Sequence, residues 1–352
     1  MIIMENRILD DSHMVSPLEK GKHKIACADV PSLFAYCHDS NVGTSNPNWM
    51  AEVEDELHMS QLSLPGTHDT MAMYGGDAVQ CQSASLYELL LSGVRVLDIR
   101  CRHIADIFAI HHGIVFQKCY FGDVLDTIKE FLANYPSETI YMRVKQEHEP
   151  DNVTRTFEET FREAYWNVRP RLFWNPENSE NPTNPQLRET RGKIVVLQNF
   201  SAHSRYGVPW GKLDIQDAYH LNTNWDLYDK WEKVKAQLNK ANASSDSNMT
   251  FVNFLSGSGG SFPYFVASGK SSHGTNDPRL LTGRTTPGWK NSWVDFPRVG
   301  CFIGICSIAF EGTNVLTAER IGKDKEFNQH VGMVIADFPA KDLIERIISL
   351  NL

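Results

Sequence analysis

Apolar residues along the chain fall into short runs of strand length that alternate with segments of helical periodicity. The runs occupy residues 61–64, 94–99, 107–110, 140–144, 194–197, 251–255 and 331–336. Segments with helical spacing of apolar residues lie at 85–91, 121–134, 152–166, 226–242 and 340–350. Such alternation predicts an α/β fold with a parallel sheet and helices outside it. We expect a TIM-like (β/α) barrel, regular or irregular, as a single catalytic domain.

The two ends of the chain differ in character. Residues 1–55 mix Ser, Pro, Asn and charged residues without periodicity, so we expect an N-terminal extension that drapes over the barrel or is partly mobile. Residues 56–352 then form the barrel, with a Pro- and Asn-rich loop at 170–185. The longest apolar stretch, 299–310, is interrupted by Gly304 and indicates a buried strand. No stretch reaches the roughly 18–20 apolar residues that a membrane span needs.

Composition limits the class of protein. The 352 residues are 41% hydrophobic and 22% charged, as in globular proteins with an ample core. The net charge of −9, from 34 Lys and Arg against 43 Asp and Glu, argues against binding to nucleic acid. The first 30 residues carry charges and no continuous apolar run, so we expect no Sec signal peptide. That expectation leaves a cytoplasmic location or export by a route without such a signal.

The cysteines suggest neither a zinc site nor a complete disulfide framework. There are seven, an odd number, and none form a Cys-x-x-Cys pair. We therefore expect free and mostly buried thiols, which favours folding in a reducing compartment.

Three polar motifs follow apolar runs of strand length. His68 and Asp69 come after the first run, Arg100 ends the second, and His112 follows the third. Taken singly, a histidine after a glycine is commonly a turn residue, and an arginine at a strand end commonly faces solvent. However, the carboxyl ends of successive parallel strands meet at one mouth of a barrel, so we expect the three motifs to share a site.

The chemistry that these side chains support is phosphodiester cleavage. One imidazole can remove a proton, the second can deliver one, and the guanidinium can hold the phosphate charge. This set of groups requires no metal ion and no other cofactor.

The motifs resemble those of the bacterial phosphatidylinositol-specific phospholipase C family, whose catalytic region is the X domain. The resemblance extends from about residue 60 to about residue 340. The stretches that carry it are Leu62-Ser63-Leu64-Pro65-Gly66-Thr67-His68-Asp69, Gly93-Val94-Arg95-Val96-Leu97-Asp98-Ile99-Arg100, His111-His112-Gly113, Pro136-Ser137-Glu138-Thr139-Ile140-Tyr141-Met142-Arg143-Val144-Lys145, Arg191-Gly192-Lys193-Ile194-Val195-Val196-Leu197, Ile215-Gln216-Asp217-Ala218-Tyr219 and Val331-Gly332-Met333-Val334-Ile335-Ala336-Asp337.

The resemblance implies a division of roles among the polar residues. His68 is the expected general base for the inositol 2-hydroxyl, with Asp337 beside it. His112 is the expected general acid for the diacylglycerol oxygen, with Asp69 beside it, and Arg100 stabilises the phosphate. Without the family, Asp69 and Asp337 could equally be capping residues. Arg100 stands where calcium-dependent relatives have a carboxylate, so the resemblance implies no metal.

Recognition of the headgroup falls, by resemblance, to Lys145, Asp217 and Tyr219. Bacterial members commonly have an arginine where this chain has Asn199, a candidate headgroup contact, so the resemblance implies a headgroup pocket with one charge fewer. The implied activity is cleavage of phosphatidylinositol to diacylglycerol and inositol 1,2-cyclic phosphate, with glycosylphosphatidylinositol anchors as a second substrate. We expect a monomer that contacts the membrane peripherally.

Two other functions remain open. One is a metal-dependent glycerophosphodiesterase or sphingomyelinase D-like barrel, although Arg100 fits poorly with a carboxylate cage for Mg²⁺ or Ca²⁺. The other is a catalytically silent barrel that binds lipid. The Ser- and Gly-rich stretch at 256–260 lacks the Lys-Ser/Thr of a phosphate-binding P-loop. Four tryptophans in expected loops or element ends, Trp210, Trp225, Trp289 and Trp293, are candidates either for a lipid-contacting rim or for ordinary packing.

Overall fold

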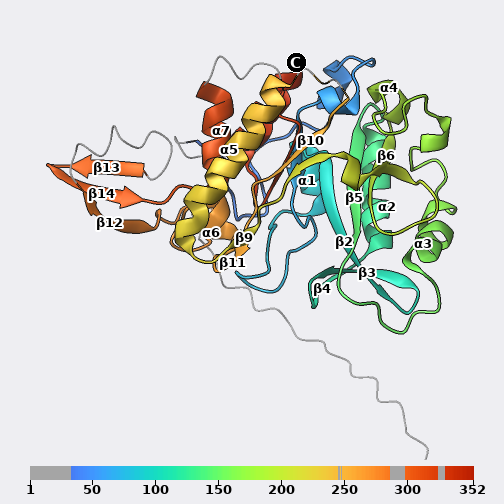
Figure 1. Ribbon diagram of the computed structural model, residues 1–352, viewed down its shortest axis with the longest axis horizontal. Coiled ribbons are helices and arrows are strands. Elements are labelled where there is room, and N and C mark those ends of the chain that lie inside the picture. The colour runs from blue at the N-terminus through green and yellow to red at the C-terminus, as the bar shows by residue number, and fades with distance from the viewer. Residues whose placement is uncertain (1–32, 245, 247, 286–297, 324–329) are drawn as a thin grey trace, which may run out of the picture.

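A curled parallel sheet forms the centre of the protein (Figure 1). The computed structural model describes residues 33–244, 246, 248–285, 298–323 and 330–352. The strands follow the order β7-β6-β5-β2-β1-β15-β10-β8, and every pair along this path is parallel. Their bounds are β1 Leu64–Thr67, β2 Val96–Ile104, β5 Thr139–Gln146, β6 Lys193–Asn199, β7 Gly207–Pro209, β8 Asp214–Gln216, β10 Phe251–Phe254 and β15 Met333–Ala336.

The barrel is irregular because the path has two ends. β7 and β8 are these ends, and the short 3₁₀ helix Trp210–Lys212 joins them. The predicted α/β fold with a parallel barrel sheet is therefore confirmed, in its irregular form.

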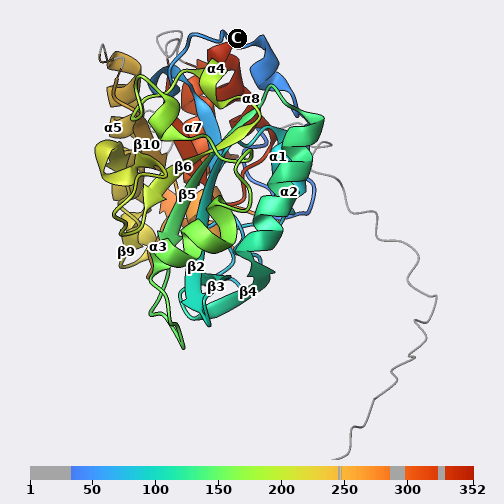
Figure 2. The same ribbon diagram turned by 90° about the vertical axis from the view of Figure 1, so that its right-hand side faces the viewer.

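Helices cover the sheet on its outer side (Figure 2). In that view α1 and α2 lie along one side of the strands and α5 along the other. The bounds are α1 Leu86–Ser92, α2 Phe121–Asn134, α3 Phe157–Thr160 with a π-helical continuation Phe161–Trp166, α4 Leu187–Thr190, α5 Leu227–Ala243, α6 Pro263–Ser268, α7 Thr313–Lys323 and α8 Lys341–Ile348. None of the helices within the described ranges is long and apolar enough to cross a membrane.

Helix boundaries follow local capping. α2 has the predicted bounds, but the helix expected at 152–166 begins only at Phe157. The Thr156 side chain accepts a hydrogen bond from the Glu159 backbone N–H, which makes Thr156 the N-cap. Asn152 has a positive φ of 49°, which a right-handed helix does not allow. The remaining short elements are β9 His220–Leu221, β11 Ser258–Gly259 and the 3₁₀ turns Trp49–Glu52, Met59–Gln61, Pro176–Asn178, Asn224–Asp226 and Ser349–Asn351.

The third predicted strand does not belong to the parallel barrel. β3 (Ile107–His112) runs antiparallel to β2 and pairs in turn with β4 (Val115–Tyr120). The link from β2 to β3 is only Ala105 and Asp106, both at positive φ. A parallel connection needs a crossover of a dozen or more residues, so this link enforces a hairpin. The expectation that all three motifs end successive parallel strands is therefore wrong for His112.

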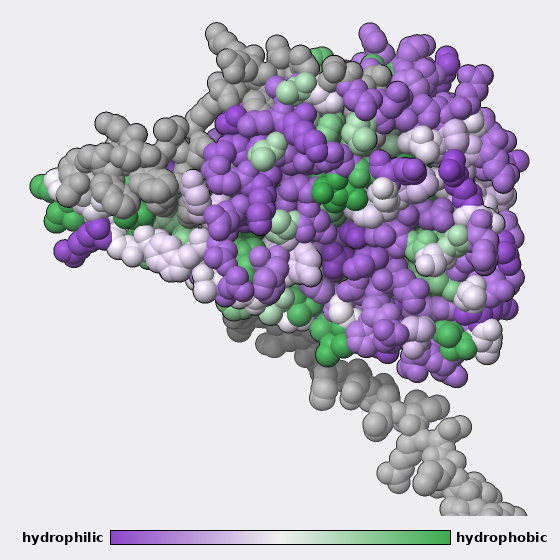
Figure 3. Space-filling model, viewed as in Figure 1, coloured by the Kyte–Doolittle hydropathy of each residue, from purple (hydrophilic) through white to green (hydrophobic). Residues whose placement is uncertain are grey.

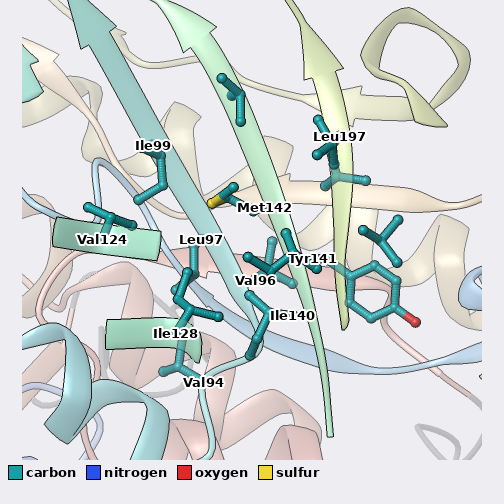
Figure 4. Packing of buried hydrophobic residues seen from close by; sticks show 14 of the residues in the cluster. Val94, Val96, Leu97, Ile99, Val124, Ile128, Ile140, Tyr141, Met142 and Leu197 are labelled. Atoms are coloured by element: carbon teal, nitrogen blue, oxygen red, sulfur yellow. The ribbon is translucent and has the colours of Figure 1, made fainter. Parts of the chain in front are cut away.

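The core lies between the sheet and its helices (Figure 4). Val124 and Ile128 of α2 face Leu97 and Ile99 of β2, and all four are fully buried. Gly66 lets β1 lie close to both neighbours, since a Cβ there would be 2.8 Å from Val96 Cβ. The close packing of interiors leaves no room for that atom.

Residues 33–55 also contribute to this core. Trp49 and Met50 are buried, and Trp49 Nε1 donates a hydrogen bond to Gly93 O at 3.0 Å. The Met50 backbone N–H donates to Glu138 Oε1, and Glu138 forms a fully buried ion pair with Arg95 at 2.6 Å. Residues 49–53 therefore help to stabilise the strands on which the barrel is built.

A second, antiparallel sheet projects from the body of the protein, on the left in Figure 1. It consists of β12 (Leu281–Thr285), β14 (Ile305–Ala309) and β13 (Arg298–Phe302) in that order. The apolar stretch 299–310 is thus a hairpin with its turn at Ile303 and Gly304, and the prediction of one buried strand is wrong. Gly304, at a φ of 74°, supplies the turn that reverses the chain.

The cysteine prediction is wrong in part. Cys301 and Cys306 form a disulfide across the β13–β14 hairpin, and Cys37 is also disulfide-bonded. Cys81, Cys101 and Cys119 are free, while Cys27 lies outside the described residues. Opposed positions in a hairpin bring two side chains within disulfide distance, which sequence spacing alone does not reveal. The argument for a reducing compartment loses its basis with these disulfides.

Candidate active site

The register of β1 and β15 brings His68 and Asp337 together. Thr67 and Ala336 are opposite each other on these parallel strands, so the residues that follow them are neighbours at the carboxyl edge of the sheet. His68 Nδ1 lies 2.8 Å from Asp337 Oδ1. The other oxygen of Asp337 is buried without a hydrogen-bond partner among the described residues. This pairing orients the imidazole so that Nε2 faces Arg100, which lines the cavity together with His68.

Arg100 of β2 lies beside this pair. Its Nη2 is 2.7 Å from His68 Nε2, and its Nε and Nη2 donate to Asp98 Oδ2 at 3.2 and 3.0 Å. Asp69 Oδ2 lies 3.5 Å from Arg100 Nη1. Because Arg100 donates to Nε2, this nitrogen of His68 carries the lone pair and Nδ1 carries the proton that Asp337 accepts.

His112 arrives from the β3–β4 hairpin rather than from a barrel strand. Its Nδ1 donates to Val79 O at 2.8 Å and lies 3.3 Å from Asp69 Oδ2. Asp69 therefore lies between the two catalytic candidates on that side, Arg100 and His112. Asp69 has a positive φ of 37°, and its side chain is fully buried. Its two side-chain oxygens make no hydrogen bond within the described part of the chain, and both charge contacts are made by Oδ2.

Burial and charge set the ionisation of these groups. Burial alone would raise the pKa of Asp98, but Arg100 and Arg143 outweigh it and hold that pKa well below its ordinary value. Burial raises the pKa of Asp69 despite the nearby Arg100 and His112. Burial would lower the pKa of Arg100, yet Asp98 and Asp69 raise it above its ordinary value. Arg100 is therefore a permanent cation in the site.

A cavity of about 290 Å³ opens above these side chains. The predicted residues that line it are His68, Arg100, His112, Lys145, Asp217 and Tyr219. Asp69 and Asp337 are buried behind the two histidines. Asn199 is not part of the lining; its Oδ1 accepts a hydrogen bond from Arg143 Nε at 2.8 Å. Eight of the nine predicted residues thus line the cavity or directly support a lining histidine, and Asn199 reaches it through Arg143.

Sequence reasoning missed Arg143, which also lines the cavity. Its Nη1 donates to Asp98 Oδ1 at 3.2 Å, and its guanidinium lies 4.4 Å from the centre of the Trp210 ring. A signal was present in the sequence, because Arg143 and Lys145 alternate on β5 and so share one face. The β2–β5 register aligns them with Asp98 and Arg100.

Glu147 and Cys81 are the other missed lining residues on this side. Glu147 Oε2 accepts from Lys145 Nζ at 2.9 Å, and its Oε1 accepts from the Gly113 backbone N–H. Glu147 therefore ties the end of β5 to the turn that follows His112. Burial would raise the pKa of Glu147, but Arg100 and Lys145 lower it, so it remains a carboxylate.

One group near the cavity has the geometry to hold a metal ion. His68, Cys81 and Asp337 have ligand atoms within 4.8 Å of one another. Burial, together with Asp337, raises the pKa of the Cys81 thiol well above its ordinary value. A thiophilic ion would therefore have to displace the thiol proton and the hydrogen bond between His68 and Asp337.

The tryptophan candidates divide between packing and exposure. Trp210 is buried under Arg143, whereas Trp225 is 66% exposed. Tyr219 and Phe262 are also exposed large apolar residues near the cavity mouth. Trp289 and Trp293 lie outside the described residues. A larger hollow of about 840 Å³, lined in part by Arg279 and Val299, lies at the base of the projecting sheet and contains none of the predicted site residues.

Comparison with known proteins shows which family this chain resembles. The family model "Phosphatidylinositol-specific phospholipase C, X domain" matches residues 59–200. The chain is 36% identical over 260 residues to the 1-phosphatidylinositol phosphodiesterase of Staphylococcus aureus strain Newman, a match that covers 64% of this chain and 80% of the relative. It is 30% identical over 225 residues to the 1-phosphatidylinositol phosphodiesterase of Listeria monocytogenes, covering 59% of this chain and 67% of the relative.

Solved structures extend the similarity over more of the chain. A structure of the Staphylococcus aureus phosphatidylinositol-specific phospholipase C, solved in work on the modulation of its membrane binding, matches with a TM-score of 0.64 and 27% identity. That match covers 88% of this chain and 98% of the other. The Listeria monocytogenes enzyme matches with a TM-score of 0.59 at 24% identity, which supports the shared fold.

Proposed function

This chain belongs to the bacterial phosphatidylinositol-specific phospholipase C family, and we infer from that membership that it cleaves phosphatidylinositol to diacylglycerol and inositol 1,2-cyclic phosphate. The observation that carries the proposal is the arrangement of two carboxylate-supported imidazoles around one cavity, with Arg100 between them. An acid and a base on opposite sides of a phosphate are what an intramolecular transfer requires.

His68 acts as the general base. Its proton is on Nδ1, where Asp337 accepts it, so the Nε2 lone pair is available for the inositol 2-hydroxyl proton. In the free enzyme, Arg100 Nη2 donates a hydrogen bond to His68 Nε2. A bound phosphate oxygen offers Arg100 a stronger, charged acceptor, so substrate binding releases Nε2 for catalysis. As the base gains its proton, Asp337 stabilises the imidazolium.

His112 acts as the general acid. Its Nδ1–H is held by Val79 O, and Asp69 Oδ2 lies 3.3 Å from the same nitrogen, so Nε2 is the nitrogen that donates the proton to the leaving group. The bond from the inositol 2-oxygen to phosphorus forms while the bond from phosphorus to the diacylglycerol oxygen breaks. The proton of the 2-hydroxyl passes to His68, and the Nε2 proton of His112 passes to the leaving oxygen. Arg100 stabilises the charge on the remaining phosphate oxygens.

The headgroup lies among Lys145, Asp217, Tyr219 and Arg143. Lys145 and Arg143 donate to hydroxyls, Asp217 accepts from them, and the Tyr219 ring covers an apolar face of the sugar. Asn199 acts in this scheme by holding Arg143 through their 2.8 Å hydrogen bond. A glycosylphosphatidylinositol anchor presents the same inositol hydroxyl, so we include it as a second substrate.

We propose that the reaction needs no metal ion. The carboxylates around the phosphate position already have partners, since Asp98 pairs with the cations Arg100 and Arg143, and Asp337 accepts the hydrogen bond of His68 Nδ1. A cation at the phosphate would also meet Arg100 there, and like charges repel. If the protein is instead a metal-dependent phosphodiesterase, its turnover should depend on an added metal ion. If it is a silent lipid-binding barrel, it should show no turnover at all. We further propose that the protein is a monomer that meets the membrane peripherally.

Phosphorus NMR of phosphatidylinositol in mixed micelles with EDTA tests these points together. The wild type should produce the signal of inositol 1,2-cyclic phosphate, and His68→Ala and His112→Ala should not. His203→Ala, which removes an exposed histidine outside the cavity lining, is the matched control and should behave as the wild type. Turnover that appears only after Ca²⁺ or Mg²⁺ is added would overturn the metal-independent mechanism, and no turnover with or without these ions would favour the silent barrel.

A further inference from the structure

We propose that the tip of the projecting β13–β14 hairpin inserts into lipid and anchors the enzyme on membranes. The inference rests on the proposed function, because a substrate in a bilayer requires the enzyme to work at a lipid surface. The tip consists of Phe302, Ile303 and Ile305 around the turn, and it is distinct from the cavity and its rim.

Exposure is the first observation. Phe302, Ile303 and Ile305 are 78%, 83% and 61% exposed. Figure 3 shows hydrophobic colour at the end of this projection, on a face that is otherwise mostly hydrophilic. No charged residue occurs from Val299 to Ala309. Clustered apolar side chains of this kind mark an interaction site, whereas single exposed ones do not.

Backbone conformation is the second observation. Ile303 has a φ of 46°, in the left-handed region, where a β-branched residue is a genuine outlier. The turn conformation favours Asn or Gly at this position. Ile303 is therefore unfavourable both for the turn and for exposure to water. Neither penalty is explained by packing within the described residues, so the side chain points to a role outside the fold.

A lipid surface fits this tip better than a second protein copy does. The hairpin pairs Phe302 with Ile305, so its backbone polar groups are largely satisfied internally, as burial in lipid demands. The Cys301–Cys306 disulfide closes the hairpin directly behind the tip without adding a charge. Three side chains cover far less than the roughly 800 Å² per partner of a stable protein interface. Shallow insertion into the boundary of headgroups and acyl chains requires no such area.

The hairpin is also tied to the cavity. α6 begins at Pro263, which lines the cavity, and ends at Ser268. The next residue, Gly269, accepts a hydrogen bond from the Leu280 N–H directly before β12. In Figure 1 the projecting sheet leaves the body beside α6 and α7. The projecting sheet is therefore connected to the cavity wall through α6.

Vesicle binding tests the proposal. We would compare the wild type, Ile303→Asn and the triple variant Phe302→Ser/Ile303→Asn/Ile305→Ser on sucrose-loaded phosphatidylcholine vesicles, with and without phosphatidylinositol. The triple variant should lose about 10-fold or more in partition coefficient. Ile303→Asn should weaken partition and yet melt at the same or a higher temperature, because Asn tolerates the left-handed conformation. Val168→Asn removes another exposed β-branched side chain, 60% exposed, and should change nothing.

Two further measurements separate this proposal from its alternatives. Turnover of monomeric short-chain phosphatidylinositol should be the same in the triple variant and the wild type. If neither the wild type nor the triple variant turns over that substrate, the proposed function is wrong. The comparison of their partition onto vesicles still tests whether the tip binds lipid. Lipid insertion would be overturned if the triple variant partitioned onto vesicles as strongly as the wild type. It would also be overturned if sedimentation showed the wild type to be a dimer and the triple variant to be a monomer that still binds vesicles.

Discussion

Arg143 offers a sharp test of how the headgroup is recognised. A guanidinium has five N–H groups, and two of those on Arg143 donate to Asn199 and Asp98. The other three have no partner within the described residues, and the side chain lines the cavity. A hydrogen bond from a charged donor contributes about 1.5–3 kcal/mol. Arg143→Met should therefore lower kcat/KM by about 10- to 150-fold.

Asn199 provides the second corner of a double-mutant cycle. If it acts only by orienting Arg143, Asn199→Ala should lower kcat/KM by about 5-fold, equivalent to about 1 kcal/mol for one hydrogen bond. In the Arg143→Met background the same substitution should then cost nothing. Initial rates on phosphatidylinositol in mixed micelles with EDTA give all four values of the cycle.

Controls distinguish this effect from a loss of folding. Arg143→Met leaves Asp98 with its two hydrogen bonds from Arg100, so no buried carboxylate loses all its partners. Arg102→Met removes a nearby guanidinium that donates to Glu149 O outside the cavity lining, and it should retain activity. Full activity of Arg143→Met would refute the reasoning. An Asn199→Ala cost that persists without Arg143 would show that Asn199 contacts the headgroup itself.

Three further outcomes follow from the geometry. Asp337→Asn should lower kcat on phosphatidylinositol by about 100-fold or more with little change in KM, because the amide no longer stabilises the His68 imidazolium. Gly66→Ala should lower Tm by about 2–10 °C, since the new Cβ would lie 2.8 Å from Val96 Cβ. Burial lowers the pKa of Lys230 from 10.5 to about 7, so the unfolded chain binds more protons between these values. The Tm of wild type relative to Lys230→Met should therefore rise from pH 7 to pH 10.

Each of these outcomes has a contrary result. Normal kcat for Asp337→Asn would remove this carboxylate from the mechanism, and wild-type Tm for Gly66→Ala would mean that β1 can move away from its neighbours. A constant Tm difference across the pH range would mean that Lys230 stays charged in the folded state. Its Nζ donates to Phe254 O, which also accepts from Gln216 Nε2, so removal of the lysine leaves that carbonyl with a partner.

Local signals in the chain predicted most of the barrel strands, although β7 and β8 at the two ends of the sheet were not among them. α2 has the predicted bounds because its apolar residues repeat at helical spacing and Pro136 follows closely. The helix expected at 152 begins at Phe157 instead, because the capping interaction of Thr156 with Glu159 sets its start. Capping depends on a few atoms at the helix end and not on the periodicity of the whole segment.

The sequence pattern did not predict the direction and register of the strands. The two-residue link Ala105-Asp106 makes β3 antiparallel, so His112 approaches the cavity from a hairpin and not from a barrel strand. The disulfide between Cys301 and Cys306 depends in the same way on the pairing of β13 with β14. Both results required knowledge of which residues lie opposite each other across a turn.

The sequence by itself determined the fold class and the chemical character of the site, because periodicity and residue type are local properties. Tertiary structure alone decided which of those groups meet. It aligned His68 with Asp337 through the β1–β15 register, and it placed Arg143 rather than Asn199 in the cavity wall. Contacts between residues far apart in the chain depend on register, strand order and side-chain direction together, and no single segment carries that information.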